Sequence, residues 1–140
     1  MKIHKVDAAR RQIEAAIRLW EDEDHVSALT LAGAAEEILG NLLGRSNMTS
    51  FLKRISDQAE QRQSKLPPKE LYKIVNRTKN ALKHANDDSE DAVEFDVEDA
   101  RLMVTRALIN YQELTGALTS KMSAFMAKHV IGSWLLPEDE

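Results

Sequence analysis

Four polar side chains that can bind and act on a phosphate recur at helical spacing in the middle of the chain. Lys73, Arg77, Asn80 and His84 follow one another at intervals of four, three and four residues. A continuous helix would stack them in one stripe beside the apolar residues of the same segment. An Arg there can bind a phosphate, and a His can move a proton near neutral pH. The spacing therefore predicts an anion-binding stripe at the edge of a buried face.

The segment 79–84, KNALKH, resembles the Arg-Asn-x-x-x-His motif of the HEPN superfamily, the higher eukaryote and prokaryote nucleotide-binding domains. Arg77, with six residues before His84, also satisfies the broader form of that motif, in which four to six residues separate Arg and His. The resemblance covers roughly 26–114 and implies a small all-α bundle, a homodimer with paired His side chains, and either a metal-independent ribonuclease or a descendant without activity. Lys79 stands where the tighter motif has Arg, and it lacks the planar fork that holds a phosphate by two bonds.

A ribonuclease reaction would assign each of these side chains a role. Neutral His84 would accept the proton of a ribose 2′-hydroxyl, which then attacks the adjacent phosphate. Arg77, with Lys73 or Lys79, would stabilise the negative charge of the transition state. Asn80, one turn before His84, would orient the ring or hold a phosphate oxygen.

The same residues also allow a purely structural interpretation. Arg77 and His84 would then cap, pair or bridge helices, with Glu36 or Glu37 as partners. In the catalytic interpretation Glu37 would instead fix the tautomer of His84, provided that Glu37 faces the helix expected at 68–86. Both interpretations remain open at the level of the sequence.

Helical periodicity runs through nearly the whole chain and predicts an all-α, up-and-down bundle of five to six helices. The expected helices cover 7–20, 25–43, 49–61, 68–86, 97–115 and 118–136. Pro68 suits the first turn of the helix expected at 68–86, and Asn86 suits its C-cap. The segment 25–43 is rich in Ala, Gly and Ser on more than one side, so we expect it to be the central helix of the bundle.

Polar residues at the expected helix ends support these boundaries. Asp24 is a suitable N-cap for the second helix, and Thr49 or Ser50 for the third. Gly116 would close the helix that begins at residue 97.

Composition indicates one soluble globular domain over 1–140, with 43% hydrophobic and 30% charged residues. The chain contains no cysteine, which excludes disulfides, thiolate catalysis and Cys-ligated metals. The histidines and carboxylates lack metal-ligand spacing, so we expect neither a metal nor a cofactor. Because no signal sequence or membrane span is recognised, we expect a cytoplasmic protein without a membrane partner.

Charge is distributed unevenly around the stripe. The net charge of −4 argues against a protein that coats nucleic acid with its whole surface. The basic segment 65–84 is followed by the acidic segment 87–99. Either the basic segment binds an anion beside the acidic one, or the acidic segment neutralises it.

Two classes of function follow from these patterns. The first is a non-catalytic or weakly active HEPN-like protein that self-associates, as a homodimer, and binds RNA or a small protein. The alternative is a metal-independent endoribonuclease of toxin or defence type that uses Arg77, Asn80 and His84. Large apolar residues in 125–136 would pack either on the bundle or against a second copy.

Overall fold

All regular structure in the computed structural model, which describes residues 1–61, 68–85 and 91–132, is helical. The predicted all-α class is therefore confirmed. The elements in chain order are α1 (Lys5–Glu21), α2 (His25–Arg45), α3 (Phe51–Gln61), α4 (Pro68–Val75), α5 (Arg77–Ala81), α6 (Val97–Thr115), α7 (Ser120–Phe125) and the π-helical segment η2 (Met126–Ile131).

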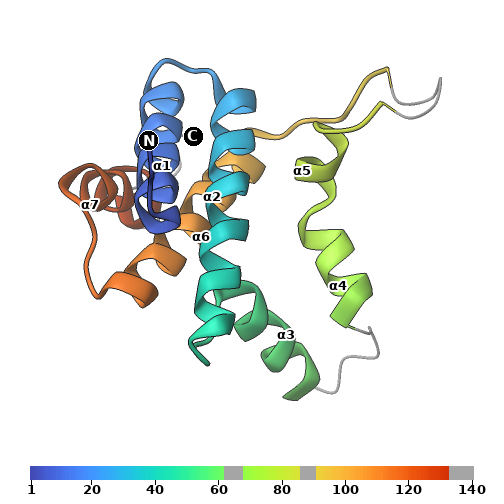
Figure 1. Cartoon of the computed structure of the whole chain (residues 1–140). Coiled ribbons are helices and arrows are strands. Elements are labelled where there is room, and N and C mark those ends of the chain that lie inside the picture. Colours follow the sequence, from blue (N-terminus) through green and yellow to red (C-terminus); the bar gives the residue numbers. More distant parts are fainter. Residues whose placement is uncertain (62–67, 86–90, 133–140) are drawn as a thin grey trace.

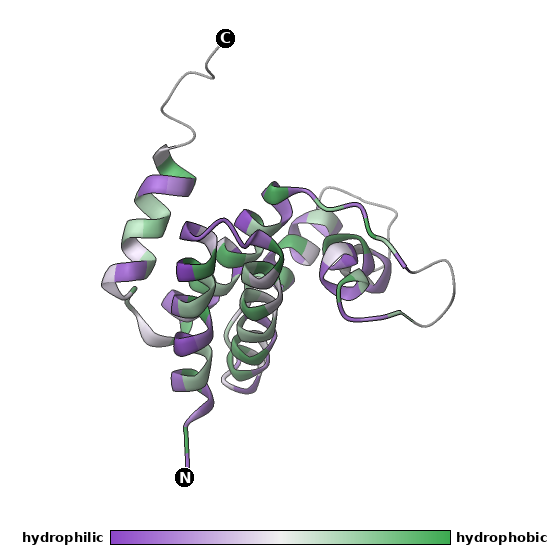
Figure 2. Ribbon diagram, turned by 90° about the horizontal axis from the view of Figure 1, so that it is seen from above, coloured by the Kyte–Doolittle hydropathy of each residue, from purple (hydrophilic) through white to green (hydrophobic). Residues whose placement is uncertain are grey.

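The core lies between α1, α2 and α6, which pack side by side (Figure 1). Small residues on α2, among them Ala28, Ala32 and Ala35, are fully buried and let the neighbouring helices approach closely. Larger side chains such as Ile13 and Leu108 fill the space between them. In Figure 2 the hydrophilic residues of α1 lie on the side away from the neighbouring helix. The expectation of a central helix at 25–43 is thus confirmed, because both other core helices pack against α2.

Three predicted helix ends are confirmed in atomic detail. The Asp24 carboxylate accepts a hydrogen bond from the Ser27 amide at 3.2 Å. The Ser50 hydroxyl accepts one from the Lys53 amide at 3.2 Å. Gly116 ends α6 with a φ of +84°, a conformation that costs a residue without a β-carbon little.

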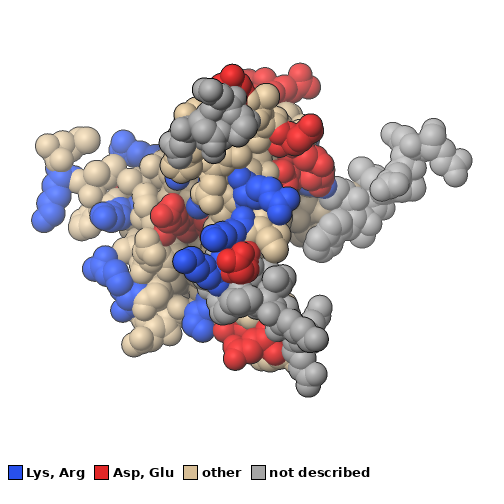
Figure 3. Space-filling view, turned by 90° about the vertical axis from the view of Figure 1, so that its right-hand side faces the viewer, with Lys and Arg blue, Asp and Glu red and all other residues tan. Residues whose placement is uncertain are grey.

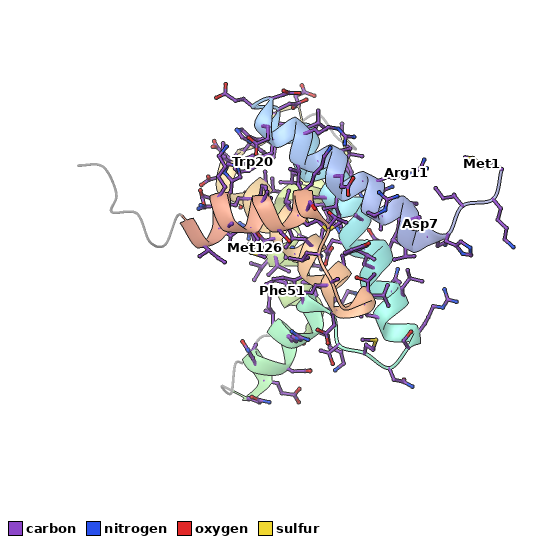
Figure 4. All side chains as sticks on the ribbon, turned by 90° about the vertical axis from the view of Figure 1, so that its left-hand side faces the viewer. Met1, Asp7, Arg11, Trp20, Phe51 and Met126 are labelled. Carbon is purple, nitrogen blue, oxygen red and sulfur yellow. The ribbon has the colours of Figure 1, made fainter. Side chains whose placement is uncertain are left out.

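The C-terminal part differs from the single helix expected at 118–136. An α-helix begins at Ser120 and passes into π-helix at Met126. Figure 4 shows this pair of segments lying beside α1, with Trp20 near Met126. Trp20 makes edge contacts with Phe125 and His129, each with ring centroids 5.6 Å apart. Residues 133–136 of the expected helix lie outside the described residues.

The central segment also differs from expectation, because the helix predicted over 68–86 is interrupted at Asn76 and its second part ends at Ala81. Asn76 has φ −108° and ψ 8°, outside the helical range. Arg106 explains the break: its guanidinium donates to the Val75 carbonyl at 3.0 Å and to the Asn76 side chain at 2.8 Å. The expected cap at Asn86 lies outside the described residues. We call α4 and α5 together the arm, which lies alongside the core helices in Figure 1 and contacts α6 through the Thr78–Asp99 hydrogen bond.

Among the described residues, α2 is the one helix long and apolar enough to cross a membrane. Core helices of soluble proteins pass the same test, and residues of α2 are buried against α1 and α6. The length and composition of α2 therefore do not test the expectation that the protein has no membrane partner.

Candidate functional site

The buried side chain of Arg106 joins the arm to the core. The Arg106 guanidinium is 1% exposed and donates to the Glu36 carboxylate at 3.0 Å. With its bonds to Val75 and Asn76, this one side chain connects α6, α2 and the turn within the arm. Removing one partner of such a pair leaves an uncompensated buried charge, so the pair fixes the guanidinium whose other hydrogen bonds hold the arm.

Asn110, one turn after Arg106, holds α3 in the same way. Its side-chain oxygen accepts from the Phe51 amide at 2.8 Å, and its amide nitrogen donates to the Glu36 carbonyl at 3.3 Å. Sequence reasoning missed both Arg106 and Asn110. The available signal was an Arg and an Asn four residues apart among the apolar positions Met103, Ala107 and Leu108 of one helix.

The side chain of Lys79 is buried and lies beside acidic side chains of the same chain. It is 6% exposed, and its ammonium lies 3.6 Å from Glu37 and 4.0 Å from Glu36. The lysine predicted to bind an anion thus already has two carboxylate neighbours. Glu37, predicted to orient His84, has its carboxylate beside Lys79 instead.

The three predicted catalytic side chains are all exposed. Arg77 and Asn80 lie on α5, whereas His84 follows the end of that helix. Within the described part of the chain, no hydrogen bond joins any two of these three side chains. Because α5 ends at Ala81, the helical turn that was expected to hold Asn80 and His84 together is missing.

A shallow groove of about 380 Å³ runs along the arm and is lined by Lys69, Lys73, Asn76 and Asn80. We call it the outer groove. Lysine and arginine side chains gather on the face of the molecule that carries the arm (Figure 3). Lys73 lies 3.4 Å from Glu70, but both side chains are more than half exposed, so this pair is weak and can be displaced. The structure thus brings Lys73 and Asn80 of the predicted stripe to one groove.

The acidic segment contacts the arm at one described position. Asp99 accepts a hydrogen bond from the Thr78 hydroxyl at 2.7 Å, which fixes α5 on α6. Asp96 instead caps α6, by accepting from the Glu98 amide at 2.9 Å. In the described part of the acidic segment, therefore, these two contacts are structural and neither neutralises a lysine of the outer groove.

The groups with a shifted pKa lie far along the chain from the arm. A hydrogen bond from His129 lowers the pKa of Glu21, and hydrogen bonds from Ser27 lower the pKa of Asp24. No group of three His, Asp or Glu side chains suited to a metal is found in the described ranges. Comparisons with family models, with curated proteins and with solved structures each found no match.

Proposed function

We propose that this protein binds single-stranded RNA through the outer groove and does not cleave it efficiently. The observation that carries this proposal is the row of polar donors on the arm. Lys69 and Lys73 supply positive charge, and Asn76 and Asn80 line the same groove. Arg77, exposed on the next turn, extends the row.

Such a surface suits a flexible phosphate chain. Single-stranded nucleic acids are bound by positively charged grooves that follow the backbone, with little demand on a rigid ligand shape. The acidic charge of the whole chain confines this role to one face. Membership of the HEPN superfamily is part of the proposal and rests on the motif at 79–84.

We expect weak or absent cleavage because of where the fold places two residues of the motif, Lys79 and His84. The ammonium of Lys79 is held between Glu36 and Glu37, where its charge stabilises the fold. A general base must be within hydrogen-bond reach of the proton that it takes, in a fixed position. His84 lies beyond the end of α5 and is exposed, so within one chain the described contacts do not hold it in place.

The alternative function, a metal-independent endoribonuclease, would need a second copy. Arg77 and His84 are both exposed, so side chains from a partner can reach them. The homodimer is a proposal that rests on this exposure and on Ile131, which is 47% exposed at the end of η2. Four small residues of α2 give it no support, because they are buried within the chain: Ala28, Ala32, Gly33 and Ala35. Light scattering that gives a 15.8 kDa species at tens of micromolar would contradict the dimer.

Fluorescence anisotropy with a labelled single-stranded RNA tests the binding proposal. Contacts to three cations, Lys69, Lys73 and Arg77, predict a slope of about −2 for log affinity against log salt, at about −0.7 for each phosphate. Lys73→Ala should weaken binding and make the slope shallower by about 0.7. Equal binding by Lys73→Ala and the unmodified protein would contradict the proposal.

Lys53→Ala is the matched control for Lys73→Ala. Lys53 is similarly exposed and is also paired within its own helix, with Asp57 at 3.2 Å, but it lies on α3 outside the groove. The Lys53→Ala variant should therefore bind RNA with unchanged affinity. Gel analysis of the same mixtures separates the two functions: a 2′,3′-cyclic phosphate product that disappears in His84→Ala would establish the ribonuclease instead.

A further inference from the structure

A second hollow, which we call the inner cavity, lies on the opposite side of the arm, between it and the helices α2 and α6. Its volume is about 180 Å³, comparable to that of roughly six water molecules at about 30 Å³ each. Ile74 and Leu102 line it and yet are 47% and 48% exposed, so they mark its open side. The inner cavity can therefore take a group the size of one ring from solvent.

Apolar side chains form the walls of the inner cavity. Leu29 from α2 and Met103 from α6 are buried in it, and Ile74 and Leu102 stand at its opening. Walls of this kind suit the faces of a flat ring, which gain from leaving water.

Polar groups at the inner cavity have unused hydrogen-bonding capacity. Arg106 lines it, and the buried Nε of Arg106 has no hydrogen-bond partner among the described residues, although both terminal nitrogens are used. Among the described carboxylates that pair with the Lys79 ammonium, the nearest oxygen, from Glu37, is 3.6 Å away, beyond a good hydrogen bond. Asp99, which accepts a hydrogen bond from Thr78 through one carboxylate oxygen, lines the cavity and supplies an acceptor. A buried donor without a partner is costly, so a ligand with acceptors would be favoured here.

We propose that the inner cavity receives one unstacked pyrimidine base of the bound RNA, an inference that rests on the proposed RNA binding. The edge of a pyrimidine presents acceptors and donors together, as Arg106, Lys79 and Asp99 require. Its single ring matches the volume of the cavity, whereas a purine adds a second ring. The apolar walls contact the two faces of the base.

The positions of the two hollows support this assignment. Lys73 lines the outer groove, and the next residue, Ile74, lines the inner cavity. Arg77 lies one turn further on and is exposed. A phosphate held by Lys73 and Arg77 would thus place its attached base beside the opening at Ile74.

The test compares three labelled oligomers of equal length: oligouridylate, oligoadenylate and an abasic ribose-phosphate chain. We expect oligouridylate to bind roughly tenfold more tightly than the other two, because contacts to one base change the affinity by about this factor. Equal affinity of oligouridylate and the abasic chain would overturn the base site and leave RNA binding intact. If none of the three binds at low salt, the proposed function itself fails.

Leu102→Trp blocks the opening, and Val26→Trp is its matched control. Val26 is 45% exposed and does not line the inner cavity. Leu102→Trp should remove the preference for oligouridylate without changing the affinity for the abasic chain, whereas Val26→Trp should change neither. Equal effects of the two variants would overturn the inference.

Photocrosslinking of the unmodified protein to 4-thiouridine RNA adds a test without mutation. The adducts should map to Leu102 or Met103. Adducts confined to other helices would contradict the assignment.

Discussion

Lys79 crosses α2 directly over Gly33, where a β-carbon added to Gly33 would lie 2.7 Å from Cδ and 3.1 Å from Cγ of the lysine. The absence of a side chain at this one position of α2 lets the stem of Lys79 lie flat and bring its ammonium between Glu36 and Glu37. Gly33 therefore contributes to the attachment of the arm.

Gly33→Ala should reveal this contact. In a helix interior, Ala for Gly normally stabilises by about 1 kcal/mol. At position 33 we expect a net loss of about 1–3 kcal/mol instead, because the lysine stem must move. Gly44→Ala is the control, since no described side chain or other helix lies within 4 Å of its added carbon. Urea unfolding that shows both variants stabilised would contradict the contact.

Removing Glu36 should destabilise the protein far more than removing Glu37. Glu36→Ala leaves the buried Arg106 guanidinium without its ion pair, which should cost about 3–5 kcal/mol. The Glu37 side chain is 58% exposed, so Glu37→Ala should cost at most about 1 kcal/mol. Denaturant unfolding of the two variants checks this difference. Equal losses would show that the buried Glu36–Arg106 pair does not stabilise the fold in solution more than the exposed Glu37 carboxylate does.

Arg77→Ala and His84→Ala should leave the free energy of unfolding within about 0.5 kcal/mol of the unmodified protein, because both side chains are exposed. Arg77→Ala should nevertheless weaken RNA binding by removing a phosphate contact. Thermal unfolding and anisotropy together check this separation. A loss of several kcal/mol in either variant would favour the structural interpretation of these residues.

Glu21 should make stability depend on acid pH. The hydrogen bond from His129 at 2.9 Å lowers the pKa of Glu21 below its ordinary value. A carboxyl whose pKa is lower in the folded state stabilises above its unfolded pKa, and this stabilisation is lost as pH falls through the folded pKa. His129→Ala should raise the pKa of Glu21 towards its ordinary value, as carbon-detected NMR titration can measure.

Lys128→Ala is the control for His129→Ala. Lys128 lies 3.6 Å from the same carboxylate and contributes less to its pKa, so its removal should raise the pKa less. An unchanged titration of Glu21 in His129→Ala would show that η2 does not rest on the end of α1 in solution.

Much of the fold was predictable because it depends on local chemistry. Apolar periodicity identifies α1, α2 and α6, and the caps at Asp24 and Gly116 act within a few residues of the chain. The break at Asn76 was not predictable in this way. Nothing between Pro68 and Asn86 opposes a continuous helix, and the interruption depends on Arg106, thirty residues later in the chain.

The sequence by itself determined the helical class, the core helices and the basic character of the arm, since periodicity and charge are properties of neighbouring residues. Tertiary structure alone decided which cations remain available to a ligand. Lys73 and Lys79 are alike in the sequence, but Lys79 packs over Gly33 beside two carboxylates, whereas Lys73 faces solvent. Burial and pairing across helices set that difference, because the cost of placing a charge depends on the groups that surround it in space.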